Sequence, residues 1–102
     1  MVKKKVKAAA VKTHPYDAAV YLETEEDMAD YLAAALEDGD PQVVTLALGA
    51  IARARGMSKI ARKSGLGRQN LYKALSAEGH PELATILKVI KALGLQLTAK
   101  AA

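Results

Sequence analysis

Residues 57–76 read MSKIARKSGLGRQNLYKALS, a pattern typical of two short helices joined by a tight turn. Gly65 suits the turn, because glycine adopts the left-handed backbone conformation that a side chain penalises. Ala61 is small where the second helix would pass close to the first. The wedge between the helices would be filled by Ile60, Leu66, Leu71 and either Ala74 or Leu75. The stretch therefore predicts a helix-turn-helix, with an ordinary helical hairpin as the alternative.

The second of these helices keeps its polar side chains mostly near its amino-terminal end, the part that enters the major groove of DNA in a helix-turn-helix. Arginine suits guanine, glutamine and asparagine suit adenine, and lysine suits guanine or phosphate. The residues expected to contact base edges are Arg68, Gln69, Asn70 and Lys73.

Cationic residues on both sides of the turn are expected to contact DNA phosphates, which sets register on the duplex without reading sequence. The expected phosphate contacts are Arg53, Arg55, Lys59, Arg62, Lys63 and Tyr72. For each cation the alternative is a solvated surface charge.

Charge divides the chain into three parts. Residues 1–12 hold five lysines and no acid, and residues 17–40 hold nine acids and no Lys or Arg. Residues 41–102 hold ten Lys and Arg against two acids, a net charge of +8. Such a basic block is typical of polyanion binders. We therefore expect residues 41–102 to form a helix-turn-helix DNA-binding domain, preceded by a mobile basic tail (1–13) and an acidic helical segment (14–40).

Local signals predict helices before residue 57. Thr24 and Asp27 have the spacing of a capping box that opens a helix over residues 24–37. Asp40 and Pro41 start a second helix, which Gly56 ends. The apolar stripe of the first helix is Met28, Tyr31, Leu32, Ala35 and Leu36.

The remaining signals complete an all-α, compact helical domain. Ser58 can cap a short helix from Lys59 to Ser64, and another helix runs from about Arg68 to Ser76. Pro81 begins a last helix that Gly94 ends. Residues 95–98 alternate between apolar and polar and could form a short C-terminal strand.

Composition excludes several classes of protein. The chain has no Cys, which excludes disulfides and thiolate chemistry. No stretch reaches the roughly 18–20 apolar residues of a membrane span or the about 7–15 of a signal peptide, so we expect a cytoplasmic protein that binds no membrane. His14 and Asp17 are the one conceivable catalytic pair, but both fall in a turn beside the tail, where no rigid site supports them. We therefore expect a protein without enzymatic activity, without a bound metal ion and without a cofactor.

From Tyr16 to Leu97 the chain resembles the probable addiction-module antidote proteins, which are antitoxins with a helix-turn-helix of the phage-repressor (Cro/repressor) kind. The residues that carry the resemblance are Tyr31–Asp40, Ile51–Met57, Gly65–Arg68, Leu71–Leu75 and Leu87–Leu95. Two positions depart from the pattern: Gly67 stands where many relatives have a Ser or Thr cap, and His80 stands where Asn is expected before Pro81.

The resemblance implies a repressor-like fold, a small RelE-like toxin bound by the chain, and repression of the promoter that both genes share. The acidic segment would face the basic toxin by charge complementarity, or it is simply one more packing helix with solvated acids. We also expect a two-fold dimer on operator DNA, with residues 95–98 as an edge that pairs with its own copy. The alternative function is a stand-alone phage-type repressor without a toxin partner.

Overall fold

The structure, a computed structural model, describes residues 22–102, and within them it contains five helices and no strand. The helices are α2 (Glu25–Asp38), α3 (Pro41–Arg55), α4 (Met57–Ser64), α5 (Arg68–Ala74) and α6 (Leu83–Ala92). The all-α prediction is confirmed for this part of the chain. The predicted basic tail (1–13) and the turn with His14 and Asp17 lie outside the described residues.

The predicted starts of the first two helices are confirmed by their hydrogen bonds. The Thr24 hydroxyl accepts from the Asp27 amide at 3.0 Å, and the Asp27 carboxylate accepts from the Thr24 amide at 3.2 Å, which completes the capping box. At α3 the Asp40 carboxylate accepts from the Gln42 amide at 2.9 Å, with Pro41 in the first turn. Local chemistry alone therefore sets these two boundaries.

Two other helix starts differ from the prediction. Helix α4 begins at Met57, directly after Gly56 with φ +105°, and no side chain caps it, so the predicted cap by Ser58 is wrong. Helix α6 begins at Leu83 with Glu82 as its N-cap residue, two residues after the predicted start at Pro81. Helix α5 ends at Ala74, before the predicted Ser76.

The predicted C-terminal strand is absent, since residues 95–98 have no regular structure and no strand lies among residues 22–102 to pair with them. Instead, the Leu95 amide donates to the Ile90 carbonyl at 3.1 Å and closes the end of α6. The Leu95 side chain is partly buried against the core. The alternation of residues 95–98 thus reflects one packed leucine and one exposed leucine.

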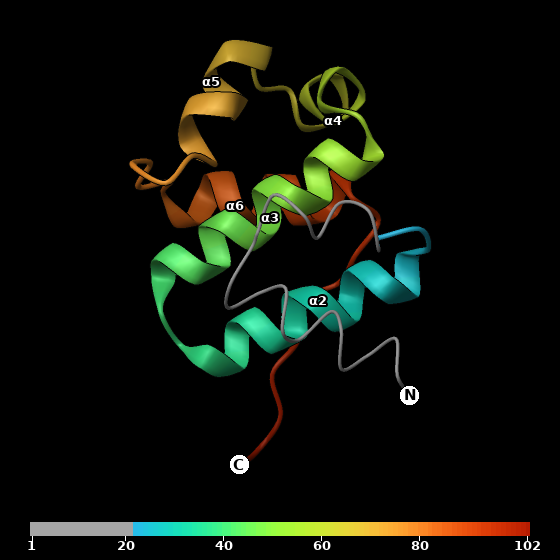
Figure 1. Cartoon of the computed structure of the whole chain (residues 1–102), viewed down its shortest axis with the longest axis vertical. Coiled ribbons are helices and arrows are strands. Elements are labelled where there is room, and N and C mark those ends of the chain that lie inside the picture. The colour runs from blue at the N-terminus through green and yellow to red at the C-terminus, as the bar shows by residue number, and fades with distance from the viewer. Residues whose placement is uncertain (1–21) are drawn as a thin grey trace.

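One hydrophobic core runs through all five helices. Tyr31 of α2, Leu48 of α3, Ile60 of α4, Leu71 of α5 and Val89 of α6 are all fully buried in it. Helix α3 and helix α6 lie in the middle of the molecule, α4 and α5 at one end, and α2 at the opposite end (Figure 1). The acidic helix therefore shares a core with the basic helices and lies at the opposite end of the molecule from α4 and α5 in this view, although its first turn reaches Arg55 at the end of α3.

The predicted stripe of α2 is buried except at its end. Met28, Tyr31, Leu32 and Ala35 are in the core, but Leu36 keeps 43% of its surface exposed. Leu36, the last residue of the stripe, therefore lies at the surface and not in the core.

Candidate nucleic-acid interface

Helices α4 and α5 are held together by the apolar positions that the sequence pattern singles out. Ile60, Ala61 and Leu71 are buried, and of the two residues predicted for the last position it is Leu75 that is buried. Leu66 is partly buried against the same core. Figure 1 shows α4 almost end-on and α5 from the side, so the two helices cross steeply. The turn between them is residues 65–67.

The turn and the helix starts depend on glycines. Gly65 has φ +78° and its amide donates to the Arg62 carbonyl, so a left-handed residue ends α4 as predicted. Gly56 and Gly67 precede α4 and α5, and neither helix has a side-chain cap. The first amides of both helices are thus without the side-chain acceptor that Ser or Thr would supply.

Gly49, a residue that the sequence reasoning missed, fixes where α5 ends relative to α3. A Cβ atom at this position would lie 2.8 Å from the Leu75 carbonyl oxygen, too close for any side chain. Glycine therefore lets the backbone at the end of α5 approach α3 directly. A glycine inside an apolar helix pattern is the signal that could have revealed it.

The polar residues of α5 do not all lie on one line. Successive residues of a helix are turned by about 100°, and Leu71 and Leu75 mark the buried side. Gln69 and Lys73 then lie at the centre of the exposed face, with Arg68 and Tyr72 on the flank toward α4 and Asn70 on the other flank. All four predicted base-contact residues are exposed.

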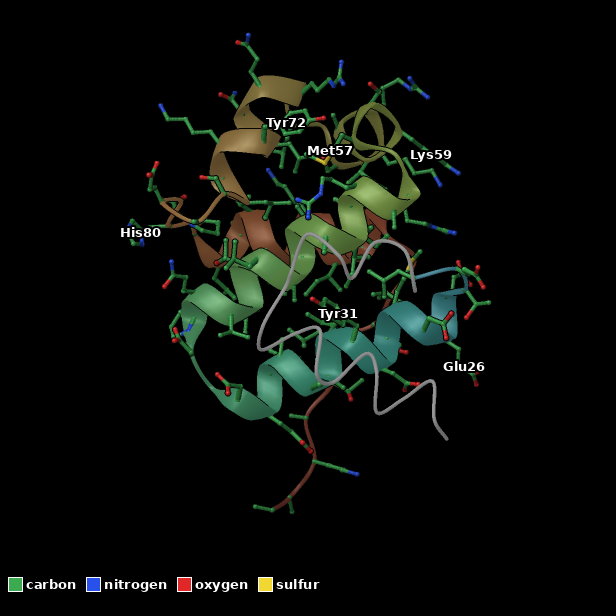
Figure 2. All side chains as sticks on the ribbon, in the orientation of Figure 1. Glu26, Tyr31, Met57, Lys59, Tyr72 and His80 are labelled. Carbon is green, nitrogen blue, oxygen red and sulfur yellow. The ribbon has the colours of Figure 1, made fainter. Side chains whose placement is uncertain are left out.

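Four cations from three helices surround a shallow hollow beside this face, which we name the basic hollow. Its volume is about 570 Å³ and no carboxylate lines it. Its lining residues are Arg53, Gly56, Met57, Ser58, Lys59, Arg62, Arg68 and Tyr72. Figure 2 shows Met57 between Tyr72 on α5 and Lys59 on α4. The structure thus brings together five of the ten predicted site residues: Arg53, Lys59, Arg62, Arg68 and Tyr72.

Within the basic hollow, Arg68 lies against Tyr72. The guanidinium carbon is 5.4 Å from the centre of the ring, and an Arg68 Nη donates to the Tyr72 hydroxyl at 3.5 Å. A cation over an aromatic face is attracted by the ring's negative face. Arg68 is therefore oriented toward α4 in this structure, whereas Gln69 and Lys73 face outward from α5.

Two of the predicted phosphate contacts lie apart from the basic hollow. Arg55 forms an ion pair with Glu25 of α2 at 3.1 Å, which draws its guanidinium toward the acidic helix. Lys63 lines a separate hollow of about 440 Å³ with Lys88 and Lys91 of α6. These two lysines of α6 were not predicted as site residues, because only the folded chain brings them next to Lys63.

Residues 22–102 contain neither a membrane-spanning helix nor a metal-binding cluster. None of the helices in residues 22–102 has the length and apolar character needed to cross a membrane. The same residues contain no group of three or more His, Asp or Glu side chains placed to hold a metal ion.

Tyr31 of α2 is buried, and its hydroxyl has no hydrogen-bond partner in the described part of the chain. Burial raises the pKa of this hydroxyl, and the positive charge of Arg53 partly offsets the rise.

Comparison with known proteins gives a family match over most of the chain. Residues 12–101 match a family model described as "Probable addiction module antidote protein". A Haemophilus influenzae protein described as uncharacterized is 49% identical over 81 residues, covering 79% of this chain and 84% of that relative. No solved structure matches the chain.

Proposed function

This chain belongs to the probable addiction module antidote proteins, a description that implies an antitoxin role and a toxin as partner, and from this premise we propose that it also binds DNA sequence-specifically and represses its own operon. The observation that carries the proposal is the basic hollow beside the exposed face of α5. Cations of α3, α4 and α5 converge there without a carboxylate, and the acidic helix α2 lies at the other end of the molecule.

In this proposal α4 and α5 act as a repressor-like helix-turn-helix. Gln69 and Lys73 face the bases, with Arg68 and Asn70 on either side of them. Arg53, Lys59 and Arg62 contact phosphates, and the uncapped amides of α4 add donors for phosphate oxygens. Tyr72 holds Arg68 until DNA offers a better acceptor. No step of this function is catalytic.

The proposed partner is a small, basic RelE-like toxin encoded beside this chain's gene. Toxins that cleave RNA are basic because they hold a polyanion, so an acidic surface would speed their encounter with the antitoxin. A two-fold dimer on the operator supplies the second half-site that high specificity requires. A stand-alone repressor is the second candidate; it would need α2 for its core, but it would have no use for the acidic charge of that helix.

The experiment that tests DNA binding compares Arg53→Ala with Arg55→Ala in the full chain. Both remove one arginine from the end of α3, but only Arg53 lines the basic hollow, whereas Arg55 pairs with Glu25. We expect Arg53→Ala to weaken binding to all DNA and to reduce the slope of log K against log salt by about one unit. Arg55→Ala should leave that slope nearly unchanged. Equal slopes for the wild type and both variants would contradict the proposed face.

The antitoxin part is tested by expressing this chain with the product of the neighbouring short open reading frame. We expect that product to arrest growth alone and growth to resume when this chain is present. If no such reading frame exists, or its product is harmless, the stand-alone repressor is favoured. Sedimentation of the free chain and of its operator complex tests the dimer, and a monomer in both would contradict it.

A further inference from the structure

The loop that follows α5 lines a hollow with mostly apolar walls, which shares Gly79, His80 and Pro81 with a second hollow beside Asn70 and Lys73. The first of these hollows has a volume of about 660 Å³, within the range of about 300–1,000 Å³ usual for ligand pockets. It lies where the turn between α2 and α3 meets residues 77–81 and the start of α6. Apolar side chains form most of its lining, among them Leu36, Pro41, Val44, Pro81 and Ile86. We name it the apolar hollow.

The apolar hollow explains why Leu36 is more exposed than the rest of the apolar stripe of α2. Leu36 continues the apolar stripe of that helix, yet 43% of its surface is exposed because it faces this hollow and not the core. When a partner covers a leucine on an open apolar surface, the burial of that surface lowers the free energy of the complex.

One carboxylate lines the apolar hollow, and further acids adjoin its lining in the sequence. Asp40 belongs to its lining, and no Lys or Arg does. Glu37, Asp38, Glu78 and Glu82 are exposed and adjoin lining residues in the sequence. Glu78 and Glu82 are the two acids of residues 41–102, and Glu78 lines the neighbouring hollow together with Lys73.

Two contacts hold the walls of the apolar hollow together. The Gln42 side-chain amide donates to the Ala77 carbonyl at 2.9 Å, which ties the start of α3 to the loop that follows α5. Gly79 lies so close to the end of α5 that an added Cβ would be 2.3 Å from the Ala74 carbonyl oxygen. A surface held in this way loses little conformational freedom on binding.

We infer that the apolar hollow is the docking site for a basic protein partner, which inserts an apolar side chain there and places Lys or Arg against the adjoining carboxylates. This inference rests on the proposed function, in which that partner is the cognate toxin, and names the surface that holds it. A second copy of this chain fits less well, because a two-fold contact would bring the same carboxylates against each other.

The test uses the full chain and two matched pairs of variants, with the purified product of the neighbouring reading frame as probe and affinity measured by calorimetry. Leu36→Lys puts a charge into the apolar hollow. Leu97→Lys is its control, because Leu97 has the same exposure, 43%, but does not line the hollow. Asp38→Lys reverses a charge at the hollow, and Glu26→Lys reverses one at the other end of α2. Figure 2 shows Glu26 and His80, which lines the hollow, on opposite sides of the molecule.

We expect Leu36→Lys and Asp38→Lys each to weaken binding by about tenfold or more, as central interface residues do. Leu97→Lys and Glu26→Lys should stay within about twofold of the wild type. Circular dichroism checks that each variant is folded, and Asp38→Lys serves alone if Leu36→Lys does not fold.

Three results would overturn the inference while leaving the toxin pairing intact: wild-type affinity in all four variants, equal weakening by Glu26→Lys and Asp38→Lys, or self-association of the free chain that Leu36→Lys abolishes. The first removes the docking site, the second spreads the attraction over all of α2, and the third assigns the hollow to a second copy. Failure of the wild-type chain to bind the probe would contradict the proposed toxin pairing itself, and this inference with it.

Discussion

Replacing Gly49 by alanine should destabilise the protein, although alanine is the better helix former. In an unhindered helix interior Gly→Ala gains about 1 kcal/mol. Here the new methyl would lie 2.8 Å from the Leu75 carbonyl oxygen, which is backbone and cannot rotate away. Overpacking of this kind costs about 1–3 kcal/mol, and a backbone clash belongs near the upper end. The net loss should be about 1–2 kcal/mol.

Thermal unfolding followed by circular dichroism measures this loss. For a domain of this size it corresponds to a midpoint roughly 4–16 °C lower. Ala33→Gly, an exposed position in α2, is the control for propensity alone and should lower stability by about 1 kcal/mol. A more stable Gly49→Ala variant would refute the reasoning, since it would mean that propensity and not the approach of α5 governs this position.

Three further predictions concern the described helices. Thr24→Ala should lower the free energy of unfolding by about 1 kcal/mol in urea denaturation, because it removes the capping box of α2, while Thr24→Ser should change it little; equal losses in both variants would contradict the cap. Tyr31→Phe should raise stability by about 1 kcal/mol, since the buried hydroxyl has no partner among the described residues. Burial raises the pKa of Tyr31, so above about pH 10 the unfolded chain releases this proton first and stability falls with rising pH; Tyr31→Phe should flatten that fall, and an unchanged pH profile would count against it. Gln42→Ala should leave the helix content of the circular dichroism spectrum unchanged but speed amide exchange in residues 77–79, because it removes the hydrogen bond to Ala77; wild-type exchange there would show that the bond does not hold the loop.

Features set by neighbouring residues were predictable from the sequence. The Thr24 and Asp27 capping box, the Asp40 and Pro41 start of α3 and the left-handed Gly65 each depend on residues within one turn of each other. The same is true of the apolar positions shared by α4 and α5, whose spacing fixes which residues meet. Gly56 ended its helix as predicted, but it also begins the next one directly, which made a cap at Ser58 unnecessary.

Features set by distant segments were not predictable. The exposure of Leu36 depends on the hollow that it lines with residues 79–81 and Ile86, and the pairing of Arg55 with Glu25 joins residues 30 positions apart. Residues 95–98 alternate like a strand, but a strand needs a partner, and residues 22–102 offer none. The cluster of Lys63 with Lys88 and Lys91 likewise requires α4 and α6 to be packed together.

The central claim is that the exposed face of α5 reads DNA sequence, and the ratio of affinities for operator and random DNA tests it most directly. Fluorescence anisotropy at physiological salt would compare a duplex from upstream of this chain's gene with a scrambled duplex of equal length. We predict that the wild type prefers the upstream duplex by at least about 10³-fold. Gln69→Ala should reduce this preference by a factor equivalent to about 1–3 kcal/mol while leaving affinity for the scrambled duplex unchanged. Equal affinity of the wild type for both duplexes, or an unchanged ratio in Gln69→Ala, would contradict the account.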